Sequence, residues 1–500
     1  MPRRWWTLVA VALATFMTYL DNNVTNVAIP TIQRSLHLSV AGLEWVVSSY
    51  ILMFAALLLA GGKLADVYGR RRLFFIGLTV FTLASLGAGL AGSGGVLIGM
   101  RLLQGVGAAL LVPTTLAIIV ATFDDTRERT AAIGVWTAIG AMALAFGPLI
   151  GGLISQHLHW GWIFFINVPV GVVTFAIALL AVRESRDTST GRHLDLPGLT
   201  VSAIALFSLT YALIEGHDKG WTSGLILGAF ALAAVSATAF LLIEARSEHP
   251  MIPLALFRSP VFSGGIGVMM LWAFGVFGIY FFTSIYLQDI LGFSPTKAGL
   301  AFMPMALCIA LFAGISAPLA ARFGAHRLVA LGMLIDAAGL VLFARLGAGA
   351  TFADLMPGFV LFGAGSGLMT VPVTNAVLGA APTERSGIAS ALLNNSRELA
   401  GLLGITVIGA VLRTRESIAL RHAVPPTPAF IDGYHAGLAV TIALVAVGAA
   451  VGYVALRRAP RPAATAAGAA AAAEAGPAVA ELPAVAEILA VEEAQAGTRA

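Results

Sequence analysis

An aspartate and three asparagines interrupt the first apolar stretch of the chain. The segment "TYLDNNVTNVAIP", residues 18–30, places Asp21, Asn22, Asn23 and Asn26 at the end of an apolar run that begins at Trp5. A charged side chain at the depth of a bilayer centre costs at least a few kcal/mol. Such a group is tolerated when it has a partner, faces water or takes up a proton, so the segment predicts a functional site.

An arginine in the fourth apolar run is the expected partner of Asp21. In antiparallel helices Asp21 would lie roughly 13–14 Å below one membrane surface, and Arg101 would lie roughly 9 Å below the same surface. A nearby guanidinium favours the charged carboxylate and burial favours the protonated acid, so small movements could load or release a proton. The alternative is a static ion pair. We favour proton coupling by Asp21 and Arg101, because intramembrane ionisable groups are functional by default.

Composition identifies the elements that must position these residues. The 500-residue chain is 58% hydrophobic and 11% charged, with a mean hydropathy of +0.90, whereas soluble domains carry about 25% charged residues. The long apolar runs predict an all-α integral membrane protein and exclude a β-barrel, whose strands alternate over about ten residues. Fourteen expected spans lie near 6–29, 43–61, 73–92, 95–121, 131–155, 162–182, 198–215, 222–243, 261–287, 297–320, 327–346, 355–379, 387–411 and 434–456.

The remaining composition excludes several classes of protein. The net charge of +4 is spread over short loops and gives no reason to expect nucleic acid as a partner. One cysteine, Cys308, cannot form an intramolecular disulfide or a cysteine-based metal site. The first apolar run, about 24 residues long, exceeds a signal-peptide core, so we expect it to remain as a helix of a multi-pass plasma-membrane protein.

Loop charges predict the orientation. Most Lys and Arg residues fall in loops on the side of the N-terminus, which places both termini in the cytoplasm by the positive-inside rule. Arg413, Arg415 and Arg421, in the loop expected between the last two spans, oppose this bias.

The chain also contains an internal repeat. "GKLADVYGRRRL" at 62–73 aligns with "APLAARFGAHRL" at 317–328, and "GVGAAL" at 105–110 aligns with "GAGSGL" at 363–368. Two parallel halves suggest a transporter with its site at their interface. The predicted divisions are a six-helix half at 1–182, an inserted helix pair with linkers at 183–260, a second six-helix half at 261–456, and a disordered Ala/Glu/Pro-rich cytoplasmic tail at 457–500.

Several motifs together resemble the major facilitator superfamily, and specifically its fourteen-helix drug:proton antiporters of the EmrB/QacA type. They are "LDNNVTNVAIP" in the first span, "GKLADVYGRRR" after the second, "RLLQGVGAAL" in the fourth, "GVWTAIGAMALAFGPLIGG" in the fifth and "WGWIFFINVPVG" at the start of the sixth. Departures from the family pattern occur at Asn23, Thr25, Val67, Ala143 and Gly161.

The resemblance implies a monomeric exporter that uses inward proton flow to drive amphipathic small molecules outward across the lipid bilayer by alternating access, without a cofactor. "GAGSG" at 363–367 lacks a following Gly-Lys-Ser and predicts no ATP site. The alternatives are a proton-coupled transporter that exports or imports a specific metabolite, and a membrane-embedded enzyme or lipid-handling protein. An enzyme would need a constellation of loop residues that the sequence does not offer. His157 and His159 have no obvious further ligand, so no metal site is expected.

Two motifs suggest moving parts. Asp66 ends the second span, where the helix dipole disfavours an acid, and therefore needs a positive partner. Arginines 70–72 could supply it, and the resemblance implies that the start of the thirteenth span near 385–387 takes part in a cytoplasmic gate. This gate motif comprises Gly62, Asp66, Gly69, Arg70 and Arg71. The antiporter motif in the fifth span, Gly134, Gly147, Pro148, Gly151 and Gly152, would permit a kink and a close interface with the other half.

Other polar and aromatic residues are candidates for the transport cavity. They are Asn22, Asn26, Trp45, Tyr50, Gln104, Asn394, Arg397 and Glu398. Asp336 is expected near mid-depth and away from substrate, whereas Glu44 and Glu215 are expected to be solvated at outer helix ends.

Overall fold

A computed structural model describes residues 2–186, 195–247, 250–382 and 385–459, and all the regular elements of these residues are helices. The N-terminal part comprises α1 (Arg3–Leu36), α2 (Val40–Tyr68), α3 (Arg70–Gly89), α4 (Gly94–Thr122), α5 (Thr126–His157), α6 (Trp162–Phe165) and α7 (Asn167–Ala181). The pair α8 (Leu196–Lys219) and α9 (Gly224–Arg246) follows, with η1 (Leu254–Arg258) after it. The C-terminal part comprises α10 (Pro260–Ile285), η2 (Tyr286–Ile290), α11 (Pro295–Phe323), α12 (Ala325–Phe343), α13 (Phe352–Gly379), α14 (Ser386–Arg421), α15 (Pro426–Ala455) and η4 (Leu456–Arg458).

The helices confirm the fourteen expected spans. Thirteen helical stretches in the described part of the chain are long and apolar enough to cross a membrane, with α6 and α7 forming one of them. The fourteenth is α1, which has 34 residues but is less apolar because of its aspartate and asparagines. Most helices extend several residues beyond the apolar runs.

The largest extension corrects an expectation from the loop charges. Helix α14 continues to Arg421, so Arg413, Arg415 and Arg421 belong to a helix and not to a loop.

The repeat is visible in the packing of corresponding helices. A Cβ atom added to Gly105 of α4 would lie 2.5 Å from the carbonyl oxygen of Tyr50 in α2. In the second half, a Cβ atom on Gly363 of α13 would lie 2.4 Å from the carbonyl oxygen of Met305 in α11. Such close backbone approach requires glycine, because any side chain would displace the neighbouring helix. The same contact is therefore built twice.

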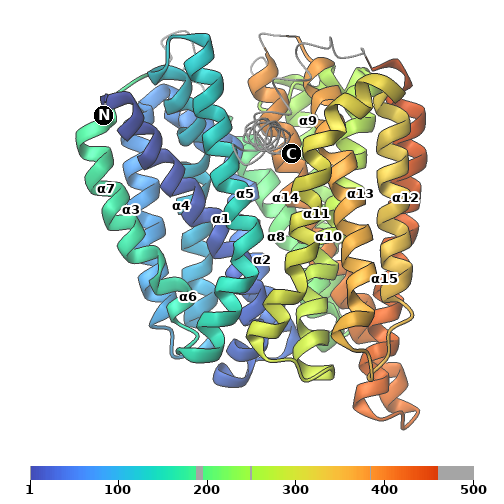
Figure 1. Cartoon of the computed structure of the whole chain (residues 1–500). Helices are drawn as coiled ribbons and strands as arrows, with labels where there is room; N and C mark the ends of the chain where they lie inside the picture. Colours follow the sequence, from blue (N-terminus) through green and yellow to red (C-terminus); the bar gives the residue numbers. More distant parts are fainter. Residues whose placement is uncertain (1, 187–194, 248–249, 383–384, 460–500) are drawn as a thin grey trace, which may run out of the picture.

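The helices form two groups and an additional pair. Figure 1 shows α1–α7 beside α10–α15, diverging toward the end of the bundle that carries the N-terminus. Helices α8 and α9 pack on each other, and α8 also contacts α2 of the first group and α14 of the second. The exact domain boundaries remain a prediction, and residues 460–500 of the expected tail lie outside the described residues.

Close contacts between the halves lie at the end of the bundle opposite the N-terminus. A Cβ atom on Gly152 of α5 would lie 2.4 Å from the carbonyl oxygen of Pro295 at the start of α11. Gln288 Nε2 of η2 donates a hydrogen bond of 2.8 Å to the carbonyl oxygen of Val27 in α1. These contacts hold the two groups together at that end.

Candidate functional site

Asp21 and Arg101 form a buried ion pair within the N-terminal half. Arg101 Nη1 of α4 contacts Asp21 Oδ2 of α1, and the two residues are 0% and 1% exposed. Depth along the two helices predicted this meeting. A buried charge is stable only when it is paired and hydrogen-bonded, so the surroundings of the pair determine what it can do.

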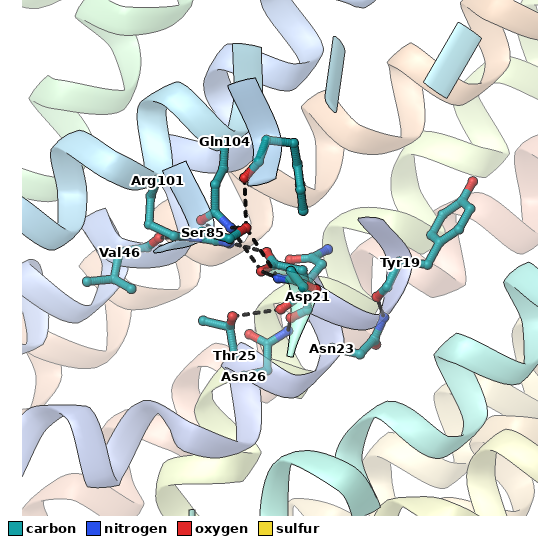
Figure 2. A network of polar contacts seen from close by, with 12 residues as sticks. Tyr19, Asp21, Asn23, Thr25, Asn26, Val46, Ser85, Arg101 and Gln104 are labelled. Atoms are coloured by element: carbon teal, nitrogen blue, oxygen red, sulfur yellow. Dashed lines mark hydrogen bonds and ion pairs between the residues drawn. The ribbon is translucent and has the colours of Figure 1, made fainter. Parts of the chain in front are cut away.

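The second carboxylate oxygen of Asp21 accepts two amide hydrogen bonds. Gln104 Nε2 of α4 donates to Asp21 Oδ1 at 3.0 Å, and Asn167 Nδ2 of α7 donates to the same atom at 2.7 Å. Gln104 also donates to Ser85 Oγ of α3 at 2.8 Å. Figure 2 shows Arg101, Gln104 and Ser85 converging on Asp21. Both carboxylate oxygens of Asp21 therefore have partners among the side chains of α4 and α7.

Ser85 and Asn167 were not predicted as site residues. Both are buried, and each is an isolated polar residue in an apolar run. Asn167 does lie in "WGWIFFINVPVG". Its amide within an otherwise apolar span was the one feature of the sequence that could have indicated a role in the site.

The guanidinium of Arg101 is held by three further groups. Its Nε donates to the carbonyl oxygen of Val46 in α2 at 3.1 Å, and its Nη1 donates to Gln104 Oε1 at 3.1 Å. The Tyr50 ring lies under the guanidinium with its centroid 4.4 Å from Cζ. Tyr50 is 4% exposed, so it supports Arg101 and offers little surface to a ligand.

Asn22 and Asn26 occupy one face of α1, one helical turn apart. The side-chain oxygen of each is buried, and neither accepts a hydrogen bond from the described residues. Asn26 Nδ2 donates to the backbone oxygen of Asn22 at 3.2 Å. Unpartnered amide oxygens are costly unless a donor reaches them, so these two atoms can accept hydrogen bonds from a ligand or water.

The polar residues predicted in the thirteenth span lie on α14 in the second half. Arg397 Nη2 contacts Glu398 Oε1 at 3.0 Å, and Glu398 is 6% exposed. Asn394 is exposed and donates to the backbone oxygen of Ser390. The candidate residues of α14 therefore divide into a buried acid with its arginine and an exposed amide.

The glycines of the antiporter motif place α5 between α1 and α11. Cβ atoms on Gly147 and Gly151 would lie 2.5 Å from Asn23 Cβ and 2.7 Å from the Val24 carbonyl oxygen, both in α1. Toward the second half, Gly152 faces Pro295. These small residues permit backbone contact on two sides of one helix.

Two other residues of this motif lie on the same helix. A Cβ atom on Gly299 of α11 would lie 2.3 Å from the carbonyl oxygen of Pro148, which extends the close interface with the second half. Gly134 lies nearer the start of α5.

The loop motif joins α2 to α3. Asp66 pairs with Arg70 at 2.8 Å, so of the two expected kinds of partner the structure uses the arginine. Gly69 has φ +111°, a conformation that favours glycine. A Cβ atom there would lie 2.7 Å from the carboxylate of Glu184, which accepts a hydrogen bond from the backbone N–H of Arg71.

The first glycine of the loop motif has a looser environment. A Cβ atom on Gly62 would lie 3.6 Å from Pro113 Cβ of α4, an ordinary contact distance.

The expectation for Glu44 was wrong. Glu44 of α2 is 0% exposed and contacts Arg413 of α14 at 3.3 Å. Arg413 also donates to the carbonyl oxygen of Ile214 in α8 at 2.8 Å and lies 3.9 Å from Asp218. We call this junction of α2, α14 and α8 the three-helix clasp. The extended α14 supplies Arg413, a cation expected in a loop.

Trp45 also contacts α8. Its Nε1 donates to Glu215 Oε1 at 2.9 Å, and its ring lies 6.0 Å from Phe207 and 6.4 Å from Tyr211 between centroids. Trp45 therefore anchors the inserted pair and is not positioned as a stacking surface for substrate. Glu215 is partly buried by this contact and by Lys219 at 3.3 Å, so solvation alone does not account for it.

Two repeated helical halves with a paired charge in the membrane interior define a polytopic transporter. The Major Facilitator Superfamily model matches residues 11–405. The chain belongs to this superfamily of multi-pass membrane transporters of small molecules and is therefore not an enzyme.

The most informative relatives are resistance proteins. The chain is 37% identical to the puromycin resistance protein pur8 of Streptomyces alboniger, over 88% of each chain. It is 36% identical to the multidrug resistance protein Stp of Mycobacterium tuberculosis, over 81% of this chain and 75% of that protein. It is 35% identical to the tetracenomycin C resistance and export protein of Streptomyces glaucescens, over 83% and 77%.

Solved structures show the same fold. An auto-inhibited POT family peptide transporter has a TM-score of 0.68 at 16% identity, covering 93% of this chain and 99% of that chain. A bacterial homologue of the human lysosomal transporter Spinster, inward-facing and unoccupied, has a TM-score of 0.64 at 17% identity, covering 91% and 98%.

Proposed function

We propose that this protein is a proton-coupled exporter of amphipathic drugs or related small molecules, working by antiport. One observation carries the proposal: Asp21 is a buried carboxylate on α1 whose cation and two amide donors come from α4 and α7. Any movement that separates Arg101 from Asp21 removes the main stabilisation of the charged form and favours protonation. Proton uptake and helix rearrangement are thereby coupled.

The contacts between the halves support alternating access. If the termini face the cytoplasm, as the loop charges predict, the close contacts of α5 with α11 lie on the outer side. The conformation would then be closed to the outside. The loop motif with Asp66 and Arg70 lies at the opposite end and would close the inner side in the alternate conformation.

The nature of the substrate is inferred from the relatives and from the site. The relatives are named for resistance to puromycin and to tetracenomycin C, and one is named for export. Asn22, Asn26 and Glu398 would supply polar contacts within largely apolar surroundings. A monomer contains both halves and so the whole pathway. The runner-up function is proton-coupled transport of one specific metabolite.

The test uses purified protein in liposomes with an imposed pH gradient and a panel of fluorescent lipophilic cations together with puromycin. We expect substrate to move uphill while protons move in the opposite direction, and we expect both fluxes to be lost in Asp21→Asn. Asp432→Asn is the matched control, because Asp432 is exposed on α15, and it should transport like the original protein.

Three results would contradict parts of the proposal. Coupled flux that survives in Asp21→Asn would move the proton site elsewhere, with Glu398 next to test. Proton and substrate moving in the same direction would establish a symporter. Absence of transport for every compound in the panel would favour a specific metabolite.

A further inference from the structure

The second half contains a buried acid that the site around Asp21 does not use. Asp336 of α12 is 0% exposed, and its Oδ1 accepts a hydrogen bond of 3.1 Å from the hydroxyl of Ser366 in α13. Ser366 Oγ in turn accepts one of 2.9 Å from Trp272 Nε1 of α10. Asp336 Oδ2 is buried and has no hydrogen-bond partner among the described residues. Three helices thus meet at one carboxyl group.

Packing does not require an acid at this position. By the 255-residue repeat, Asp336 corresponds to Phe81, which is also 0% exposed. The two positions also have equivalent backbone neighbours. A Cβ atom on Gly107 would lie 2.6 Å from the backbone nitrogen of Phe81, and a Cβ atom on Gly365 would lie 2.7 Å from the backbone nitrogen of Asp336. The first half fills the equivalent place with an apolar ring, so the carboxyl group is a specific addition to the second half.

The second half also lacks the cation that accompanies Asp21. The alignment of 105–110 with 363–368 has an offset of 258 residues, and by this offset the position that matches Arg101 holds Phe359. The Phe359 ring contacts Phe302 and Phe343. Within the described ranges, Asp336 makes no ion pair. A buried carboxylate without a cation costs several kcal/mol, whereas one unpaired oxygen of a neutral acid costs about 1–3 kcal/mol. The surroundings therefore favour the protonated acid.

We propose that Asp336 is a second proton-binding site, located in the second half of the chain, and that it is occupied by a proton in this conformation. Its role in transport rests on the proposed proton-coupled function. The hydrogen-bond chain from Asp336 through Ser366 ends at Trp272, a partly exposed side chain. Release requires a conformation in which water reaches the carboxyl group: the O–H bond of the acid then breaks, the proton passes to that water, and the carboxylate keeps its hydrogen bond from Ser366.

Infrared difference spectroscopy tests the occupied state without any substrate. The carbonyl stretch of a protonated carboxylic acid should be present at neutral pH and should disappear in Asp336→Asn. Ser366→Ala should shift this band instead of removing it, because the carbonyl loses a hydrogen bond. Asp432→Asn should leave the band unchanged. If the spectra of the original protein and of Asp336→Asn show the same carbonyl bands, the proposal is overturned.

The second measurement is the maximal accumulation of a transported compound at a fixed gradient of about one pH unit. Each coupled proton contributes about 1.4 kcal/mol per pH unit, a tenfold change in accumulation. Asp336→Asn should therefore lower the limiting accumulation about tenfold while the protein still transports. Unchanged accumulation would overturn the role of Asp336 in coupling, even if the infrared band were lost.

The two proposals fail in distinguishable ways. If the original protein shows no proton-coupled flux, the proposed function fails, yet the infrared band still reports the protonation of Asp336. If flux is coupled and the band is absent, only the second site fails.

Discussion

Replacing Arg101 with methionine is expected to destabilise the protein strongly, because it leaves Asp21 as a buried charge without its cation. The change removes the ion pair, the hydrogen bonds from Arg101 to Val46 and Gln104, and the stacking on Tyr50. Breaking a buried ion pair by removing one partner costs about 3–5 kcal/mol. Methionine fills much of the same volume, so the loss reports charge and hydrogen bonding more than packing.

The assay is denaturant unfolding in mixed micelles, compared with two further variants. Arg34→Met, at an exposed arginine near the end of α1, should change the free energy of unfolding by less than about 0.5 kcal/mol. The double variant Asp21→Asn/Arg101→Met should recover part of the loss, because no charge then remains buried. A coupling energy of about 0.5–3 kcal/mol between the two sites is expected.

Two results would refute this reasoning. One is an Arg101→Met variant as stable as Arg34→Met, which would mean that Asp21 does not depend on the guanidinium. The other is a double variant that loses the sum of the two single losses, which would mean that the residues stabilise the fold independently.

Three further changes have expected outcomes. Gly152→Ala would place a methyl group against the Pro295 carbonyl oxygen and weaken the α5–α11 contact by about 1–3 kcal/mol. Spin labels on α5 and α11 should move apart, and an unchanged distance between them would contradict the prediction. Glu44→Gln removes the charge that balances Arg413 and should destabilise the three-helix clasp by about 3–5 kcal/mol. Spin labels on α2 and α14 should then lie farther apart, whereas the control Glu416→Gln on α14 should leave their distance unchanged. Gly69→Ala forces a side chain into φ +111° and should cost about 1–3 kcal/mol in thermal unfolding; wild-type stability would show that the loop relaxes freely.

The membrane-spanning elements could be predicted because each one is a long apolar run, and hydropathy reports such runs directly. The meeting of Asp21 with Arg101 was also predictable, since depth along a helix follows from residue number at 1.5 Å per residue. The repeat, visible as paired glycine motifs, matched the contacts that Gly105 and Gly363 make in the two halves.

Contacts at the ends of helices and contacts made by isolated polar residues were not predictable. Glu44 and Arg413 are 369 residues apart, and the sequence gives no sign that α14 carries Arg413 into the bundle. Ser85 and Asn167 are single polar residues whose partner, Asp21, is fixed only by tertiary packing. A single hydroxyl or amide in a span forms no periodic pattern, so the sequence does not show whether it donates a hydrogen bond to a buried carboxylate or faces the surface.

The neutrality of the ion pairs within the helical bundle has an electrical consequence. Asp21 with Arg101, Glu44 with Arg413, and Glu398 with Arg397 each sum to zero charge. A movement that keeps both partners of a pair together carries little net charge across the membrane field, in which one elementary charge is worth about 2.3 kcal/mol per 100 mV. When Asp21 is protonated and parts from Arg101, the added charge is that of the bound proton. The voltage dependence of the cycle is then set by what is exchanged. One proton against one monovalent cation would be electroneutral, whereas one proton against an uncharged compound would draw on the membrane potential.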